Sequence, residues 1–288
     1  MEELYKLIER KGFHRMGNVF NVKSIIVTIV AIIAIAVGYF VFQSITSPAR
    51  AVANQVNSVQ LASEQSKVEM NKTAPAQFNG QVRKVAYLTF DDGPGKYTAE
   101  LLNILKQNDA KATFFLIGAN VKQFSDLVKR EKVEGHYVGM HSMTHNFKRL
   151  YTSGEYVNEM KEDQGLIANI IGESPKLTRP PYGSMPGLNE ALRNKVVEGD
   201  LKVWDWTIDS LDWRYNKMPV DVGSAKIAEN VIASAKNPKE VILLHDIHPQ
   251  SVAAVPAIIK GLKEKGYEFE AYNEADHFSL NFWHDKRM

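Results

Sequence analysis

The sequence predicts an α/β protein with a mostly parallel sheet, and two observations support this prediction. From residue 82 onward, short apolar runs rich in β-branched and aromatic residues alternate with longer segments whose apolar residues recur at helical spacing. Polar residues that can carry chemistry follow the ends of several apolar runs. Such alternation indicates a parallel sheet with helices outside, either barrel-like or doubly wound, whose active residues lie where the strands end.

The individual elements follow from length and residue type. The expected strands are short apolar runs, at residues 85–90, 113–117, 137–140, 203–208 and 241–244. Segments with helical spacing form the expected helices, which are 98–108, 121–131, 155–171, 188–197, 224–236 and 251–265.

The N-terminal part predicts a membrane anchor. Residues 25–42 form an 18-residue run without a charge, long enough for a membrane-spanning helix. Basic residues are concentrated before this run, which predicts a cytoplasmic segment 1–24 and an extracytoplasmic remainder facing the cell wall. A cleaved signal peptide is the alternative, and it also exports the domain.

Composition excludes several classes of function. The chain has no cysteine, so any metal must be held by histidines and carboxylates. Five of the 35 basic and three of the 33 acidic residues precede residue 43, so the remaining part is formally neutral and nothing indicates nucleic-acid binding. Residues 43–80 are polar and aperiodic, as in a flexible or partly helical stalk.

A catalytic domain is expected over 81–270, with a tail, 271–288, packing on it.

Two adjacent carboxylates, Asp91 and Asp92, follow the first expected strand. Consecutive side chains of a continuing strand point to opposite faces, so the two could not share a site there. Gly93 and Pro94 end the strand, which frees both carboxylates to turn toward one mouth. A cation beside them would favour their ionised forms.

The segment HSMTH, residues 141–145, suggests the other ligands of such a cation. Two histidines four residues apart would share one face of a helix, as in other two-histidine metal motifs. One aspartate and two histidines leave positions open for water and substrate, which is typical of a catalytic metal site. Non-haem Fe(II) oxygenases use the same ligand set, but the second carboxylate favours hydrolysis because hydrolysis needs a base.

Five ordered motifs then resemble those of the polysaccharide deacetylases, carbohydrate esterase family 4, which share the NodB homology domain. The resemblance covers roughly residues 82–270, and its motifs are TFDDGP (89–94), HSMTH (141–145), RPPY (179–182), DSLDW (209–213) and LLH (243–245). It implies a distorted (β/α) barrel and metal-dependent removal of acetyl groups from sugars. The metal is expected to be Zn²⁺, with Co²⁺, Ni²⁺ or Mn²⁺ as alternatives.

The resemblance also implies a role for each motif residue. The metal ligands would be Asp92, His141 and His145. The catalytic group would comprise Asp91 as base, Arg179 as its partner, His245 as acid and Asp209 as the partner of the acid. Substrate contacts would come from the Tyr182 backbone N–H as oxyanion donor, and from Trp213 and Leu243 lining the groove and the acetyl pocket.

The chemistry of amide hydrolysis accounts for these roles. It needs an activated water, a stabilised oxyanion and a proton for the departing amine. We expect Arg179 to keep Asp91 ionised and Asp209 to keep His245 protonated, which predicts a bell-shaped pH profile.

The expected substrate is N-acetylglucosamine in peptidoglycan, within reach of a membrane-tethered domain. The intact Asp91–Asp92 pair resembles the glucosamine-directed branch, since relatives directed at N-acetylmuramic acid tend to replace the second aspartate. Chitin oligomers, poly-N-acetylglucosamine and O-acetylated xylan are alternatives. A non-catalytic wall-binding protein is a rival class, and a glycosidase using Asp91 with Asp209 is another.

Overall fold

A computed structural model describes residues 77–78 and 81–288. The predicted cytoplasmic segment, membrane helix and most of the predicted stalk lie outside the described residues. Within those residues, no helix is both long enough and apolar enough to cross a membrane. The description begins with a two-stranded antiparallel ribbon, β1 (Gln77–Phe78) and β2 (Gln81–Val82).

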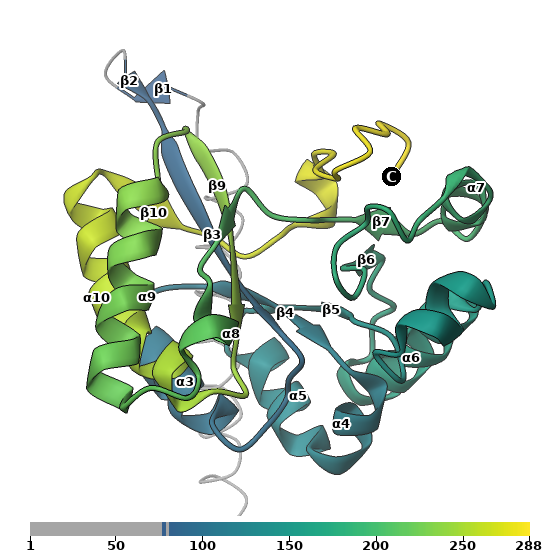
Figure 1. Cartoon of the computed structure of the whole chain (residues 1–288), viewed down its shortest axis with the longest axis horizontal. Helices are drawn as coiled ribbons and strands as arrows, with labels where there is room; N and C mark the ends of the chain where they lie inside the picture. The colour runs from purple at the N-terminus through teal and green to yellow at the C-terminus, as the bar shows by residue number, and fades with distance from the viewer. Residues whose placement is uncertain (1–76, 79–80) are drawn as a thin grey trace, which may run out of the picture. The chain divides into compact units, whose positions relative to one another are not determined.

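The main sheet is parallel throughout and curls into a half-barrel (Figure 1). Its strand order is β7-β6-β5-β4-β3-β9-β8, with β10 also paired to β3. The bounds are β3 Lys84–Asp91, β4 Ala112–Leu116, β5 Tyr137–Met140, β6 Leu177–Thr178, β7 Lys202–Val203, β8 Ile208–Asp209, β9 Lys239–His245 and β10 Tyr267–Phe269. The predicted parallel α/β barrel-like fold is therefore confirmed for the described residues.

Helices surround the outer side of this sheet (Figure 1). Their bounds are α3 Thr98–Gln107, α4 Gly118–Gln123, α5 Ser125–Val133, α6 Tyr156–Ile171, α7 Glu190–Glu198, α8 Asp212–Tyr215, α9 Val220–Ser234 and α10 Pro249–Glu264, with a π-helical turn η1 at Lys148–Thr152 and a 3₁₀ turn η2 at Glu274–Asp276. The expected helix 121–131 is two helices, because Phe124 takes a non-helical conformation (φ −124°, ψ 40°) between α4 and α5.

The prediction of one strand over 203–208 is wrong. The structure has two short strands there, β7 and β8, which lie at opposite ends of the sheet order. The chain between them pairs with the C-terminal segment instead: Trp204 forms a parallel bridge with Leu280, and the Asp205 N–H donates to the Leu280 carbonyl at 2.8 Å. The apolar character of this run thus reflects burial against the tail and not a place inside one ladder.

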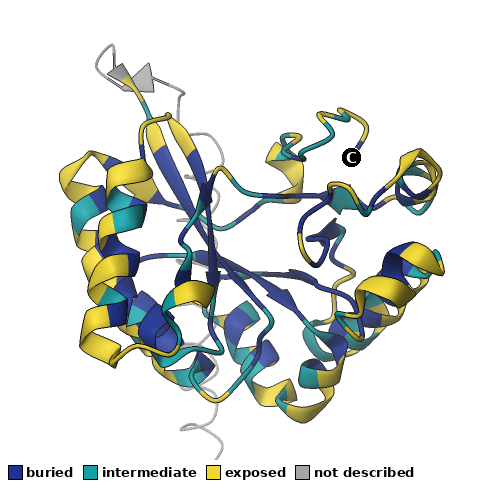
Figure 2. Cartoon of the chain, in the orientation of Figure 1, coloured by how far each residue is buried: buried dark blue, intermediate teal, exposed yellow. Residues whose placement is uncertain are grey.

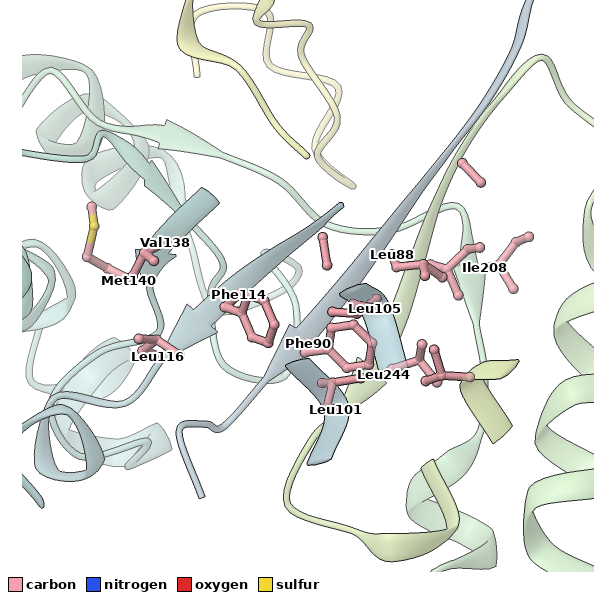
Figure 3. Close-up of a cluster of buried hydrophobic side chains, with 14 of the residues drawn as sticks. Leu88, Phe90, Leu101, Leu105, Phe114, Leu116, Val138, Met140, Ile208 and Leu244 are labelled. Carbon is pink, nitrogen blue, oxygen red and sulfur yellow. The ribbon is translucent and has the colours of Figure 1, made fainter. Parts of the chain in front are cut away.

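The sheet separates two apolar cores. Successive residues of β3 alternate between them, since side chains along a strand point to opposite faces. Leu88 and Phe90 pack in the larger core between sheet and helices, together with Leu101, Leu105, Phe114, Leu116, Val138, Met140, Ile208 and Leu244 (Figure 3). Val85 and Tyr87 pack in a second core on the other face, with Phe115, Leu177, Trp204, Val241 and Tyr272. Burial follows this arrangement, with exposed residues gathered on the outward helix faces (Figure 2).

The C-terminal segment packs on the side of the second core. The Trp204 indole N–H donates to the Phe278 carbonyl at 2.8 Å, and Trp204 and Phe278 rings lie 4.7 Å apart. The Phe282 N–H donates to Asp205 Oδ2 at 2.6 Å. These contacts hold residues 204–205 at the open side of the half-barrel.

Candidate active site

Alternation along four strands delivers four chemically active residues to one face. The inner face of β3 carries Tyr87, Thr89 and Asp91, and that of β9 carries Val241, Leu243 and His245. Asp91 and His245 are register partners of these neighbouring strands. His141 and Arg179 follow the last residues of β5 and β6 in the same inward phase, and the four meet at the carboxyl ends of parallel strands.

Asp92 joins them because the backbone turns sharply after β3. Asp92 has a left-handed φ of 71°, which breaks the strand alternation that would have sent its side chain outward. Its carbonyl accepts a hydrogen bond from the Asn120 side-chain amide at 2.7 Å. The next residue is pressed against a buried carboxyl, since a Cβ on Gly93 would lie 2.5 Å from Asp246 Oδ1. The prediction that the end of the strand frees both carboxylates holds for Asp92 only, because Asp91 is still the last residue of β3 and reaches the mouth by strand alternation.

Asp92, His141 and His145 form a cluster that could hold a metal ion. Asp92 Oδ1 lies 3.5 Å from both His141 Nε2 and His145 Nε2. Ligand atoms about 2.0–2.1 Å from a tetrahedral ion are roughly 3.3–3.4 Å apart, so this spacing fits a divalent ion. The same oxygen is buried and has no hydrogen-bond partner among the described residues. A bound cation would satisfy it.

The histidines are not on a helix, contrary to the sequence expectation. Residues 141–145 form a loop after β5, in which Ser142 (φ 72°) and His145 (φ 51°) have left-handed conformations. Hydrogen bonds from the Gly118 N–H to the Ser142 carbonyl (2.9 Å) and from the His145 N–H to Ser142 Oγ (3.0 Å) fix its course. The loop brings the two imidazoles together, with ring centroids 5.1 Å apart, without a helical turn.

Hydrogen bonds orient both imidazoles so that Nε2 faces Asp92. His141 Nδ1 lies 2.7 Å from the Arg179 carbonyl, to which it can only donate. His145 Nδ1 lies 3.1 Å from the Tyr182 hydroxyl, which in turn donates to the His145 carbonyl at 3.0 Å. Burial lowers the pKa of His141 to about 3, so its Nε2 lone pair is available at neutral pH.

Asp91 pairs with Arg179, as predicted. Arg179 Nη1 lies 2.9 Å from Asp91 Oδ1, and both side chains are buried. The guanidinium also donates to Thr89 Oγ1 and to the Trp204 and Asp205 carbonyls. Burial nevertheless raises the pKa of Asp91, although Arg179 opposes the rise. Arg179 favours the ionised form of Asp91, as expected, but desolvation outweighs it in the direction of the pKa shift.

His245 pairs with Asp212 and not with Asp209. Asp212 Oδ1 lies 2.8 Å from His245 Nδ1, and Asp212 Oδ2 accepts from the His245 N–H at 2.7 Å. Asp209 instead accepts from the Leu211 N–H at 2.8 Å. Leu211 has a left-handed φ of 58°, and α8 begins one residue later, which delivers Asp212 to the histidine. The motif DSLDW holds two aspartates, and the carry-over from the resemblance to Asp209 selected the one that does not contact His245.

The aspartate of the His245–Asp212 pair has a lowered pKa, whereas that of the Arg179–Asp91 pair has a raised one. Burial alone would lower the pKa of His245, but Asp212, with smaller effects from Asp91 and Asp92, raises it to about 9. Hydrogen bonds and the imidazolium charge overcome burial and lower the pKa of Asp212. His245 is thus protonated at neutral pH.

The three expected substrate contacts lie in different surroundings. Tyr182 is 59% exposed and Trp213 is 51% exposed, whereas Leu243 is buried on the inner face of β9 two residues before His245. Tyr182 has a left-handed φ of 68°, and its backbone N–H makes no hydrogen bond within the described part of the chain. The Tyr182 side chain lies beside the possible metal cluster, with its ring 4.6 Å from that of His145.

A parallel half-barrel whose mouth joins a possible metal site, an adjacent unligated carboxylate and a protonated histidine defines a hydrolase-like centre. Comparison with known proteins identifies the class. The polysaccharide deacetylase family model matches residues 79–204. A peptidoglycan-N-acetylglucosamine deacetylase of Bacillus cereus is 79% identical over 273 residues, covering 95% of this chain and 100% of that protein.

Solved structures agree with this comparison. The crystal structure of a polysaccharide deacetylase from Bacillus cereus is 84% identical, with a TM-score of 0.71, and the match covers 72% of this chain and 100% of that one. A family 4 carbohydrate esterase from Streptomyces lividans, solved in complex with acetate, is 32% identical with a TM-score of 0.58, covering 69% and 98%. The chain belongs to the polysaccharide deacetylase family, as its motifs predict.

Proposed function

We propose that the chain is a metal-dependent hydrolase that removes the acetyl group from N-acetylglucosamine residues of peptidoglycan, releasing acetate. The observation that carries this proposal is the arrangement at the barrel mouth. Three candidate metal ligands lie beside a buried carboxylate, that of Asp91, which is not one of the candidate ligands. A protonated histidine lies on the neighbouring strand, in register with that carboxylate.

Asp92, His141 and His145 would hold the metal ion. When bound, a divalent ion would acidify a water and polarise the acetyl carbonyl. Zinc suits two imidazoles and one carboxylate with open positions, and Co²⁺, Ni²⁺ or Mn²⁺ are alternatives. The non-haem iron alternative is disfavoured because the family relatives are named as deacetylases.

Asp91 would act as the general base. Its Oδ1 is held by Arg179, while Oδ2 lies 3.7 Å from His141 Nε2 and therefore faces the cluster. A raised pKa makes a carboxylate a better proton acceptor, and a cation beside it would favour its ionised form. Asp91 would take the proton of the attacking water.

His245 would act as the general acid. Departure of the amine requires a proton on nitrogen, and the imidazolium carries one below pH about 9. The Tyr182 N–H would stabilise the oxyanion, while Leu243 would border the acetyl methyl and Trp213 would contact the sugar.

The relatives support the choice of substrate. The 79% identical Bacillus cereus protein is named a peptidoglycan-N-acetylglucosamine deacetylase, and its match runs nearly the full length of both chains. Chitin oligomers, poly-N-acetylglucosamine and O-acetylated xylan are the alternative substrates. The predicted membrane helix, with the catalytic domain facing the cell wall, would place the enzyme beside peptidoglycan.

Acetate release from peptidoglycan tests the proposal. We expect the full-length chain to release acetate and to leave free amines on glucosamine residues, to lose this activity with a chelator, and to recover it with added Zn²⁺. Absence of acetate release with any of the four divalent ions would leave a wall-binding role. Shortened glycan strands would instead support the glycosidase alternative.

A further inference from the structure

A buried carboxylate that takes no part in the proposed reaction lies against the loop 141–145, which carries His141 and His145. Glu159 belongs to α6 and is 1% exposed. Burial of a carboxylate is costly unless hydrogen bonds or a countercharge compensate for it. The partners of Glu159 therefore indicate why the chain keeps a glutamate at this position.

Those partners all lie between and just after the two histidines. Glu159 Oε2 accepts hydrogen bonds from the backbone N–H groups of Met143 (3.1 Å) and Thr144 (3.0 Å). Thr144 Oγ1 lies 2.9 Å from both carboxylate oxygens. Glu159 Oε1 also accepts from Arg149 Nε at 2.5 Å. One carboxylate thus fixes the middle of the segment whose ends are His141 and His145.

The loop needs such support because it lacks the hydrogen bonds of a helix. In a helix, the two imidazoles would be aligned by the backbone ladder, but residues 141–145 are not helical. Ser142 and His145 hold left-handed conformations, which cost free energy for residues other than glycine. Without Glu159, the N–H group of the buried Met143 would lack an acceptor, and the exposed Thr144 would lose the contact that holds it against α6.

A carboxylate suits this task better than a neutral group. It accepts hydrogen bonds only, at several lone-pair positions, so the donors of Met143, Thr144 and Arg149 can converge on it. Arg149, which is about half exposed, supplies a countercharge from the end of the same segment. Four residues further along α6, Asp163 Oδ2 receives a longer contact of 3.2 Å from the His141 N–H, which already donates to the Leu116 carbonyl at 2.7 Å.

We propose that Glu159 is a positioning residue that holds the loop of His141 and His145 in its metal-binding conformation before any metal is bound. Outer groups that orient metal ligands commonly change metal affinity about 10–100-fold when they are removed. This inference rests on the proposed metal site, and it assigns to Glu159 the preorganisation of that site.

Zinc titration of the full-length chain provides the first test. We expect Glu159→Leu, which removes every acceptor, to weaken Zn²⁺ binding about 10–100-fold. Glu159→Gln, whose amide oxygen can still accept from Met143 and Thr144, should keep most of the wild-type Zn²⁺ affinity. Glu162→Gln is the matched control, because Glu162 lies on the same helix in an exposed 4.0 Å pair with Lys122. Equal Zn²⁺ affinities for Glu159→Leu and the control would overturn the proposal.

Hydrogen exchange of the metal-free wild-type chain provides a test that needs no variant to fold. We expect the amides of Met143 and Thr144 to exchange slowly without metal and to change little when Zn²⁺ is added. Fast exchange that slows only with Zn²⁺ would show that the metal organises the loop, and would overturn the proposal. Failure of the wild-type chain to bind Zn²⁺ would instead contradict the proposed metal site while leaving the exchange result interpretable.

Discussion

Two buried aspartates at the barrel mouth have opposite surroundings. Asp91 receives one side-chain hydrogen bond within the described structure, from Arg179, and burial raises its pKa. Asp212 receives bonds from the His245 backbone, the His245 ring and the Ser251 hydroxyl, and its pKa is lowered. Asp91 keeps an oxygen for chemistry, whereas Asp212 has both oxygens engaged.

The difference teaches that burial alone does not assign a role to a carboxylate. A carboxylate whose oxygens are saturated by donors stays ionised and can only orient or charge a neighbour. One that is desolvated and sparsely bonded has a raised affinity for protons and can accept one from a water. We therefore expect substitutions of the two aspartates to fail in different ways.

Removal of the base should have the largest effect. Asp91→Asn keeps an oxygen for Arg179 but cannot accept the proton, so kcat should fall by about 10²–10⁴-fold. Acetate release measures this loss, and Zn²⁺ affinity and the circular dichroism spectrum should be nearly unchanged. An Asp91→Asn variant with more than a third of wild-type kcat would refute the assignment of Asp91 as base.

Removal of the acid's partner should have the next largest effect. Asp212→Asn should lower kcat by roughly 10²-fold, because His245 loses both its orientation and the charge that keeps it protonated. Asp209→Asn is the matched control, since Asn can still accept from the Leu211 N–H, and its kcat should stay within about twofold of wild type. If Asp209→Asn were the more damaging variant, the pairing of His245 with Asp212 would not be the functional one.

The pH profile should report both pairs. Activity requires ionised Asp91 and protonated His245, so it should fall at acid pH as Asp91 takes up a proton and at alkaline pH as His245 loses one near pH 9. In the pH profile of the activity that Asp212→Asn retains, the alkaline limb should lie at lower pH than in the wild type, because Asp212 raises the pKa of His245. An unmoved alkaline limb would mean that another group titrates there.

Loss of the arginine should affect stability as well as activity. Arg179→Ala leaves Asp91 buried without its cation, so the free energy of unfolding should fall by about 3–5 kcal/mol. The pKa of Asp91 should rise further, which moves the acid limb of the profile to higher pH. Denaturant titration and the pH dependence of acetate release measure the two effects. Unchanged stability would show that the pair is not maintained in solution.

Substitution at the rim should have the smallest effect. Trp213 is half exposed beside Asp212, so Trp213→Ala should raise KM several-fold, consistent with loss of about 1 kcal/mol of aromatic contact, and leave kcat within about twofold. Steady-state kinetics on soluble glycan fragments measures this. A fall in kcat with unchanged KM would instead indicate that Trp213 supports the Asp212–His245 pair.

Local pattern was sufficient for much of the site. Strand periodicity placed Asp91 and His245 at strand ends, and Gly93 and Pro94 marked the turn that redirects Asp92. The motif resemblance identified the histidines and Arg179. The second aspartate of DSLDW was the available signal for Asp212, but choosing it required knowledge of the left-handed turn at Leu211.

The sequence by itself determined the parallel α/β architecture, the family and most of the side chains that meet at the barrel mouth, because hydrophobic period and motif order are properties of the chain alone. The tertiary structure decided which carboxylate meets His245, that the histidine loop is supported by Glu159 in place of a helix, and that burial outweighs Arg179 at Asp91. These depend on distances between residues far apart in sequence and on the exclusion of water, which no local pattern records.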